Sequence, residues 1–216
     1  MASKRFRNGI AAAVLASVTL APVMGKDVYV IDGRGKKHEG IELSVKSTQG
    51  DLELNVDGRI RVPFRAGSYT AAFVPKPPEI DALEKALQAG QHEAVIKAAD
   101  SAIEKYKFIG WGDRAAYLQG MSLVQTGKPD EALKAFAKGR QFRGGAAEDL
   151  NRGIILALLE QKDVERVQPL LAGMITSSRT EDAAFALNAR GRLLNDAGKS
   201  KRSEEHTSEL QSRQVI

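Results

Sequence analysis

The stretch from Gly120 to Phe136, GMSLVQTGKPDEALKAF, decides the fold of most of this 216-residue chain. Apolar residues recur at helical spacing on both sides of Gly127. Glycine commonly ends a helix, so Gly127 marks the point where the first helix stops. The stretch therefore predicts two helices joined by a short turn, which places them antiparallel.

The same helical period continues on both sides of this stretch, from Glu79 to Lys201. Seven apolar stripes of about ten to eighteen residues each end at a helix breaker. The breakers with the clearest signal are Gly90, Gly127, the Gly144-Gly145 pair and Gly198. We therefore expect seven helices arranged as antiparallel hairpins.

Three glycines inside the first helices of successive pairs indicate a repeat. Gly120, Gly153 and Gly191 are 33 and 38 residues apart. A glycine in a helix interior costs about 1 kcal/mol relative to alanine, so we interpret its recurrence as a requirement for close helix approach. With the small Ala132 and the aromatic Phe136, the Gly120–Phe136 stretch resembles a tetratricopeptide repeat, and the resemblance implies an α-helical solenoid. An irregular helical bundle is the alternative.

The repeat is less regular toward its end. Around Gly153 the residues Gln161-Lys162-Asp163 replace the turn glycine, and Pro169 falls within the second helix, so the register there is open. The final unit stops after Lys201, where its second helix is expected to begin. A repeat array that lacks half a unit leaves an apolar face uncovered.

Residues 26–74 have strand character, with alternating apolar and polar positions. The expected strands are 28–31, 41–45, 52–56, 60–64 and 69–74. Asp57-Gly58 predicts a tight hairpin. Five short strands in so few residues predict a small barrel-like unit resembling SH3-like or Sm-like modules, with a core thin enough to depend on its neighbour. The proline-rich segment 75–78 then predicts a stiff linker and a domain boundary. The fold class is thus α+β, with the helical repeats at 79–201.

Both ends of the chain differ from this core. Residues 1–25 have the basic start, apolar stretch and small-residue end of a secretory signal peptide, which predicts export, with the bacterial periplasm as the destination and no membrane-spanning helix after cleavage. Residues 202–212 resemble the in-frame translation of a common sequencing adapter, so we interpret 202–216 as a non-native tail. The whole arrangement resembles a group of exported bacterial proteins with a small β domain before tetratricopeptide helices.

The sequence offers little for catalysis. The chain has no cysteine, and its only histidines before the tail are His38 and His92, so thiol chemistry is excluded and no zinc site is expected. Gly198-Lys199-Ser200 lacks the earlier glycine and the preceding strand of a phosphate-binding loop. We therefore predict neither catalytic residues nor a cofactor, and we interpret the chain as a non-enzyme.

The resemblance to tetratricopeptide repeats implies a groove lined by the first helix of each pair. The positions three before and one after the inner glycine face this groove in that family. They correspond here to Tyr117 and Met121, Leu150 and Ile154, and Asn188 and Arg192. The middle pair is apolar, so either the register slips there or a partner covers it. We expect Tyr117, Met121, Asn188 and Arg192 to bind a protein or peptide partner, with Arg192 able to hold a carboxylate.

An alternative function rests on the β unit. Arg59, Arg61 and Arg65 would share one face of a strand and could bind an anionic envelope polymer or nucleic acid. Residues 26–201 carry a net charge of only +3, and export separates the chain from most nucleic acid, so we do not expect a nucleic-acid partner. The preferred interpretation is an exported, non-catalytic scaffold that binds other proteins through its helical groove.

Overall fold

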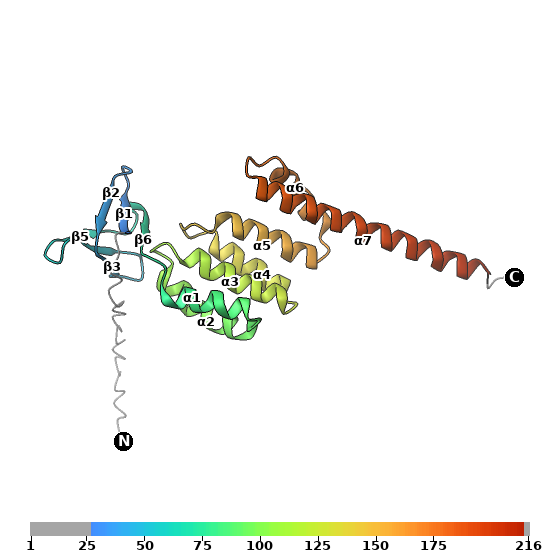
Figure 1. Cartoon of the computed structure of the whole chain (residues 1–216), viewed down its shortest axis with the longest axis horizontal. Coiled ribbons are helices and arrows are strands. Elements are labelled where there is room, and N and C mark those ends of the chain that lie inside the picture. Colours follow the sequence, from blue (N-terminus) through green and yellow to red (C-terminus); the bar gives the residue numbers. More distant parts are fainter. Residues whose placement is uncertain (1–26, 214–216) are drawn as a thin grey trace, which may run out of the picture.

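The computed structural model describes residues 27–213, in which six strands precede seven helices (Figure 1). The strands are β1 (Val28–Asp32), β2 (Lys37–Gly40), β3 (Glu42–Val45), β4 (Leu52–Asn55), β5 (Arg61–Phe64) and β6 (Tyr69–Phe73). The helices are α1 (Pro78–Gln88), α2 (His92–Tyr106), α3 (Gly112–Gln125), α4 (Pro129–Gly139), α5 (Ala147–Glu160), α6 (Val164–Ile175) and α7 (Thr180–Arg213). The expected signal peptide, residues 1–25, lies outside the described residues. The α+β class and the seven helices are as predicted.

The strands form two three-stranded antiparallel sheets, ordered β2-β1-β6 and β3-β4-β5. These sheets do not close into a barrel, so the barrel-like prediction is wrong. The chain passes from one sheet to the other at Gly40, where a Cβ atom would lie 2.5 Å from the carbonyl oxygen of Asn55. Strand β2 has no counterpart among the predicted strands, because its sequence Lys-His-Glu-Gly has no apolar alternation.

The hairpin between β4 and β5 forms at the predicted place but with a longer loop. The backbone N–H of Val56 donates to the carbonyl of Ile60 at 2.9 Å, and Gly58 has a positive φ of 90°. The Asp57 carboxylate accepts hydrogen bonds from the backbone N–H groups of Arg59 and Ile60, which organises the loop without a two-residue turn. Ile60, the first residue of the predicted strand 60–64, lies outside β5 and is 56% exposed.

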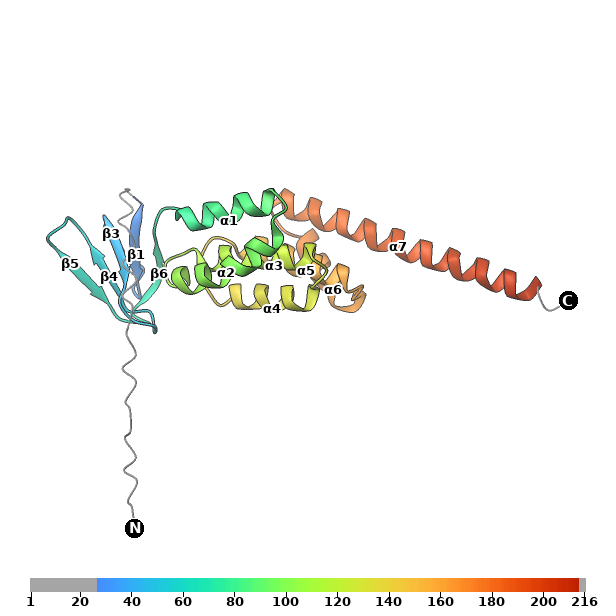
Figure 2. The ribbon, with the colours of Figure 1, turned by 90° about the horizontal axis from the view of Figure 1, so that it is seen from below.

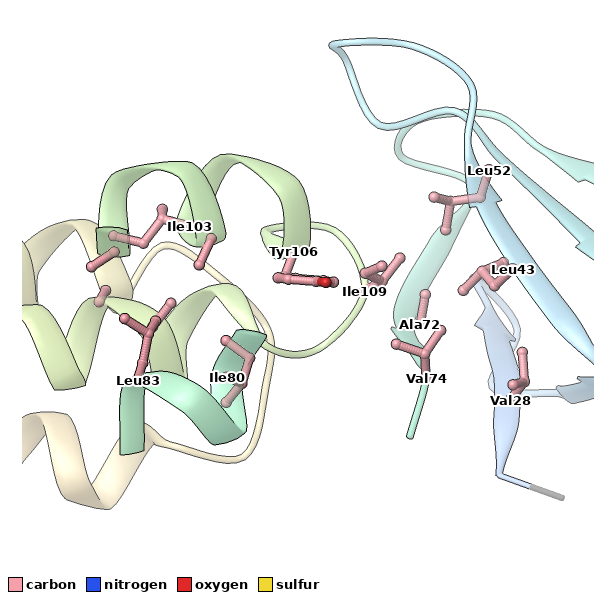
Figure 3. Close-up of a cluster of buried hydrophobic side chains, with 14 of the residues drawn as sticks. Val28, Leu43, Leu52, Ala72, Val74, Ile80, Leu83, Ile103, Tyr106 and Ile109 are labelled. Carbon is pink, nitrogen blue, oxygen red and sulfur yellow. The ribbon is translucent and has the colours of Figure 1, made fainter. Parts of the chain in front are cut away.

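The β unit and the first three helices share one hydrophobic core (Figure 3). Ala72 and Val74 from the β6 segment lie next to Ile109 and Tyr106 from the end of α2, and all four are buried. The indole N–H of Trp111 donates to the carbonyl oxygen of Val74 at 2.7 Å. The proline-rich segment therefore joins two parts whose cores are continuous, and the β unit leans on the helices as its small size predicted.

Three helix hairpins, α1–α2, α3–α4 and α5–α6, are closed by the same pair of backbone hydrogen bonds. In each, a residue of positive φ follows the first helix: Gly90, Gly127 and Lys162, with φ of 71°, 72° and 57°. Each of these residues donates to a carbonyl three positions back, and the next residue donates to one five positions back. This is the Schellman arrangement that commonly ends helices. Lys162 thus occupies the place of the turn glycine that the sequence lacks in the third hairpin.

The shared turn also aligns the second helices. The residues five and nine positions after the turn residue are all buried, at 2% exposure or less, and they are Val95 and Ala99, Ala132 and Phe136, and Val167 and Leu171. These side chains face the preceding first helix of their own hairpin or its neighbour. The turn, rather than the inner glycine, is therefore the reliable marker of equivalent positions.

Gly120 and Gly153 both make room for one aromatic ring. A Cβ on Gly120 would lie 2.3 Å from the Phe136 ring, and a Cβ on Gly153 would lie 2.6 Å from it. The predicted close helix approach is confirmed at these two glycines, because α4 inserts Phe136 between α3 and α5. It is wrong for Gly191, where a Cβ would meet nothing within 4 Å.

Helix α7 does not stop at Gly198 as predicted but continues to Arg213. Its first part packs on α6, and the remainder extends away from the other helices, at the end of the molecule opposite the β unit (Figure 2). Across residues 27–213 no helix combines the length and the apolar character that crossing a bilayer requires.

Candidate interaction surface on the first helices

Helices α1, α3 and α5, the first members of the three hairpins, lie side by side (Figures 1 and 2). Helix α7 packs on α6 and is linked to α5 by ion pairs, because Arg152 of α5 pairs with Asp182 of α7 at 2.5 Å and Arg179 pairs with Glu148 at 3.0 Å. The partly exposed side chains of these four helices form one surface, which we call the inner face.

Counting back from the shared turn corrects the register of the inner face in α5. The residue seven positions before the turn is Gly120 in α3 but Ile155 in α5, so Gly120 and Gly153 are not equivalent. The counterparts of Tyr117 and Met121 in α5 are then Arg152 and Leu156. The expected pair Leu150 and Ile154 is wrong, because Leu150 is only 1% exposed and Ile154 packs between two hydrophobic clusters.

The predicted partner-binding residues differ in how accessible they are. Tyr117 and Met121 are half-buried and pack on the hydrophobic cluster of α3, α4 and α5, and the Tyr117 ring lies 6.4 Å from the Phe136 ring. Asn188 and Arg192 of α7 are exposed. The structure thus gives Tyr117 and Met121 a half-buried position on α3 and leaves Asn188 and Arg192 in solvent on α7. That the four residues act as one binding surface stays a prediction.

A chain of ion pairs crosses the inner face from α1 to α5. The Arg114 guanidinium donates to Glu84 of α1 and to Asp149 of α5, both at 2.8 Å. Lys76 reaches the same Glu84 at 2.7 Å. Burial alone would raise the pKa of Glu84, but Lys76 and Arg114 together hold it below its ordinary value. Arg114 also lies over the Tyr117 ring, 5.2 Å from its centroid, so its position is fixed by three neighbouring helices.

Arg152 makes the corresponding link between α5 and α7. Its guanidinium donates twice to the Asp182 carboxylate and lies 6.0 Å from the Phe185 ring centroid. The hydrogen bond to Asp182 raises the pKa of Arg152 further. Because Arg114 and Arg152 are both paired, neither is available as a free anion clamp. Their effect is to hold the helices in register and to leave Tyr117, Met121 and Leu156 as the unpaired part of the surface.

Arg152 and Leu156 could have been found from the sequence by counting back from the turn residue, since Lys162-Asp163 stands where Gly127-Lys128 stands in the preceding hairpin. Arg114 carries no such signal. Its importance depends on Glu84 and Asp149, which are 30 and 35 residues away.

The three arginines of the β unit do not all lie on one strand. Arg59 lies in the loop before β5, Arg61 lies on β5, and Arg65 follows its end. The Arg61 guanidinium pairs with Glu53 at 3.0 Å, and Lys46 pairs with the same carboxylate. Residues 27–74 contain seven basic and seven acidic residues, so the unit has no net positive charge to attract a polyanion.

The remaining titratable groups have structural roles. His38 lies on β2 and is half-buried, with its Nε2 2.9 Å from Asp32 Oδ2. The buried Asp113 carboxylate accepts from the backbone N–H groups of Arg114 and Ala146, and a Cβ on Gly144 would overlap it at 2.1 Å. Burial raises the pKa of Asp113. Within residues 27–213, no group of three or more histidines and carboxylates is placed to hold a metal ion.

In comparisons with known proteins, no family model, no curated protein and no solved structure matches the chain.

Proposed function

We propose that the chain is an exported, non-catalytic scaffold whose helical hairpins are tetratricopeptide-like repeats that bind a segment of another protein on the inner face. The observation that carries this proposal is the common register of α3 and α5, which the shared turn fixes. Counting back from that turn aligns Tyr117 with Arg152 and Met121 with Leu156. Asn188 and Arg192 are assigned to the same surface from their spacing to Gly191 alone, as part of the proposal. Export is inferred from the signal-like residues 1–25 alone.

The surface would recognise its ligand by combining half-buried apolar side chains, Met121 and Leu156, with the exposed guanidinium of Arg192. Apolar side chains of the ligand would cover Met121 and Leu156, which are already half-buried and lose little conformational freedom on binding. The exposed Arg192 would pair with a carboxylate of the ligand, a contact that is bidentate at its best. The ion pairs of Arg114 and Arg152 keep the helices aligned, so the surface is preorganised for an extended segment or a helix.

The test uses the full chain as bait in an envelope extract, followed by affinity measurements with the identified partner. Tyr117→Ala and Arg192→Ala should each weaken binding by about tenfold, the loss expected for a contact worth about 1.4 kcal/mol. Arg140→Ala, an exposed arginine next to α4 on the second-helix side, is the matched control and should bind normally. Equal affinity of the wild type and both inner-face variants would overturn the proposal.

A further inference from the structure

The two edges of the sheet β2-β1-β6 differ in what lies beside them. At the β6 edge, the Arg143 guanidinium donates to the Thr70 carbonyl at 3.0 Å, and the Trp111 indole donates to the Val74 carbonyl at 2.7 Å. Strand β2 is the other edge, on the side of the sheet away from the helices (Figure 1). Within residues 27–213, β2 pairs with β1 alone. The helical part therefore covers one edge of the sheet and leaves the other open.

The backbone groups at the open edge of β2 belong to Lys37 and Glu39. In an antiparallel pair, alternate residues direct their N–H and C=O groups toward the same neighbour. The Asp32 N–H donates to the Lys36 carbonyl at 3.0 Å, so Lys36 and, two positions later, His38 face β1. Lys37 and Glu39 consequently face outward. Each offers one donor and one acceptor to a strand that approaches this edge.

The side chains of Lys37 and Glu39 carry opposite charges on one face of the strand. They form an ion pair at 2.8 Å, with side-chain exposures of 49% and 66%. An ion pair so exposed contributes little to stability. Both side chains can therefore change to partners in another chain at a small cost in free energy.

These charges favour one register for pairing between two copies of β2. A symmetric antiparallel pair places outward-facing residues opposite one another. Centred on Lys37, the pair would bring two lysines together, and centred on Glu39 it would bring two glutamates together. Like charges directly opposite are destabilising, whereas opposite charges stabilise the pair. Centred on His38, the pair places Lys37 of each copy opposite Glu39 of the other, so β2 is self-complementary in this register.

We propose that two copies of this chain associate through β2, antiparallel and centred on His38, so that their three-stranded sheets join into one continuous sheet. Lys37 of each copy exchanges two backbone hydrogen bonds with Glu39 of the other, and their side chains form ion pairs between the copies. Continued by two residues, the register brings Ile41, which is 42% exposed, beside Gly35 of the other copy, where a Cβ would meet nothing within 4 Å. So short an interface is smaller than that of a permanent dimer, so the association depends on concentration.

Sedimentation equilibrium of the full chain over a range of concentrations tests this association. The wild type should show a reversible equilibrium between monomer and dimer. Lys37→Glu and Glu39→Lys should each weaken it at least tenfold, because each variant places like charges opposite one another twice in the dimer. Lys97→Glu, which reverses the charge of an exposed lysine on α2, is the matched control and should associate like the wild type.

Charge reversal on both sides of the contact should restore the dimer. An equimolar mixture of Lys37→Glu and Glu39→Lys pairs two glutamates with two lysines, and the double variant Lys37→Glu/Glu39→Lys pairs with itself in the same way. Both samples should associate with nearly the wild-type affinity. This recovery also shows that the single variants are folded.

A cross-link tests the register. The chain has no cysteine, so His38→Cys supplies one thiol per copy. Residues directly opposite in a non-hydrogen-bonded pair have Cα atoms about 4.5 Å apart, which is within the range of a disulfide. Mild oxidation with copper phenanthroline should link two copies of His38→Cys, whereas Lys97→Cys should stay unlinked.

Several results would overturn the proposal. They are a chain that stays monomeric at every concentration, a dimer that Lys37→Glu leaves intact, and a mixture of the two single variants that does not associate. Cross-linking of Lys97→Cys in place of His38→Cys would assign the contact to the helices. The β2 edge lies away from the inner face, so the proposed function and this proposal can fail separately.

Discussion

The two ends of the helical array differ in how much of their apolar surface is buried. At the first end, the β unit and α1–α3 bury their apolar side chains in a single cluster, and the Trp111 indole donates a hydrogen bond to the carbonyl of Val74, just after β6. At the other end, α7 keeps Leu187 and Leu194 largely in solvent. The comparison teaches that the same kind of helix becomes either core or contact surface according to what lies beside it, because stacked units bury their faces only against neighbours.

The largest effect on stability should come from disrupting the core that the β unit shares with α1–α3. Trp111→Ala removes the ring that lies 5.6 Å from the Phe73 ring and the hydrogen bond to Val74. We expect a loss of about 3 kcal/mol in the free energy of unfolding, near the lower bound for a large aromatic residue because the indole is only half-buried. Urea denaturation followed by far-ultraviolet circular dichroism would measure it. Separate transitions for strands and helices in the wild type would contradict the shared core.

Equivalent leucines at covered and open positions provide the most direct comparison. Leu123→Ala should cost about 3 kcal/mol, since it leaves a cavity under α4. Leu194→Ala should cost less than about 0.5 kcal/mol, as an exposed surface substitution does. The two free energies of unfolding come from parallel urea titrations. Similar values for both variants would show that α7 is covered in solution.

The third turn allows a stabilising substitution near the open end. Lys162 has a φ of 57°, a conformation that costs a non-glycine residue about 1–2 kcal/mol. Lys162→Gly should therefore stabilise the α5–α6 hairpin by about 1 kcal/mol, after the greater chain entropy of glycine is subtracted. Thermal melting would show a higher midpoint. Lys162→Ala is the control and should gain nothing from relief of this strain, because it keeps the Cβ.

The smallest expected effect is the contribution of Asp32, in the β unit, to the acid dependence of stability. The hydrogen bond from His38 and those from the backbone N–H groups of Lys36 and Arg34 lower the pKa of Asp32 to about 2. A lowered carboxyl pKa stabilises the fold above the unfolded-state pKa of about 3.9, and this contribution is lost as the pH falls from about 4 toward 2. Urea midpoints at pH 5, 3 and 2 should decline less steeply for Asp32→Asn than for the wild type. Identical slopes would mean that Asp32 is equally accessible to protons in the folded and unfolded chain.

Much of the fold was predictable because it depends on local signals. Apolar periodicity placed all seven helices, and the breakers Gly90 and Gly127 adopt the positive φ that ends a helix. Strand β2 was not predictable, because an edge strand of charged residues is held by pairing with β1 and not by its own pattern. The inner face was only partly predictable. Tyr117 and Arg192 follow from the inner glycines, whereas Arg152 requires knowing that Lys162 replaces a turn glycine.

The amino-acid sequence by itself determined where the seven helices and five of the six strands form, and where the first two hairpin turns occur. These features depend on side-chain periodicity and on the backbone freedom of single residues, which act over a few positions. The tertiary structure alone decided that the sheets stay open, that Arg114 links α1 to α5, and that α7 runs straight through Gly198. Those outcomes depend on which surfaces meet, because a glycine permits a turn but only an apolar partner helix makes the turn favourable.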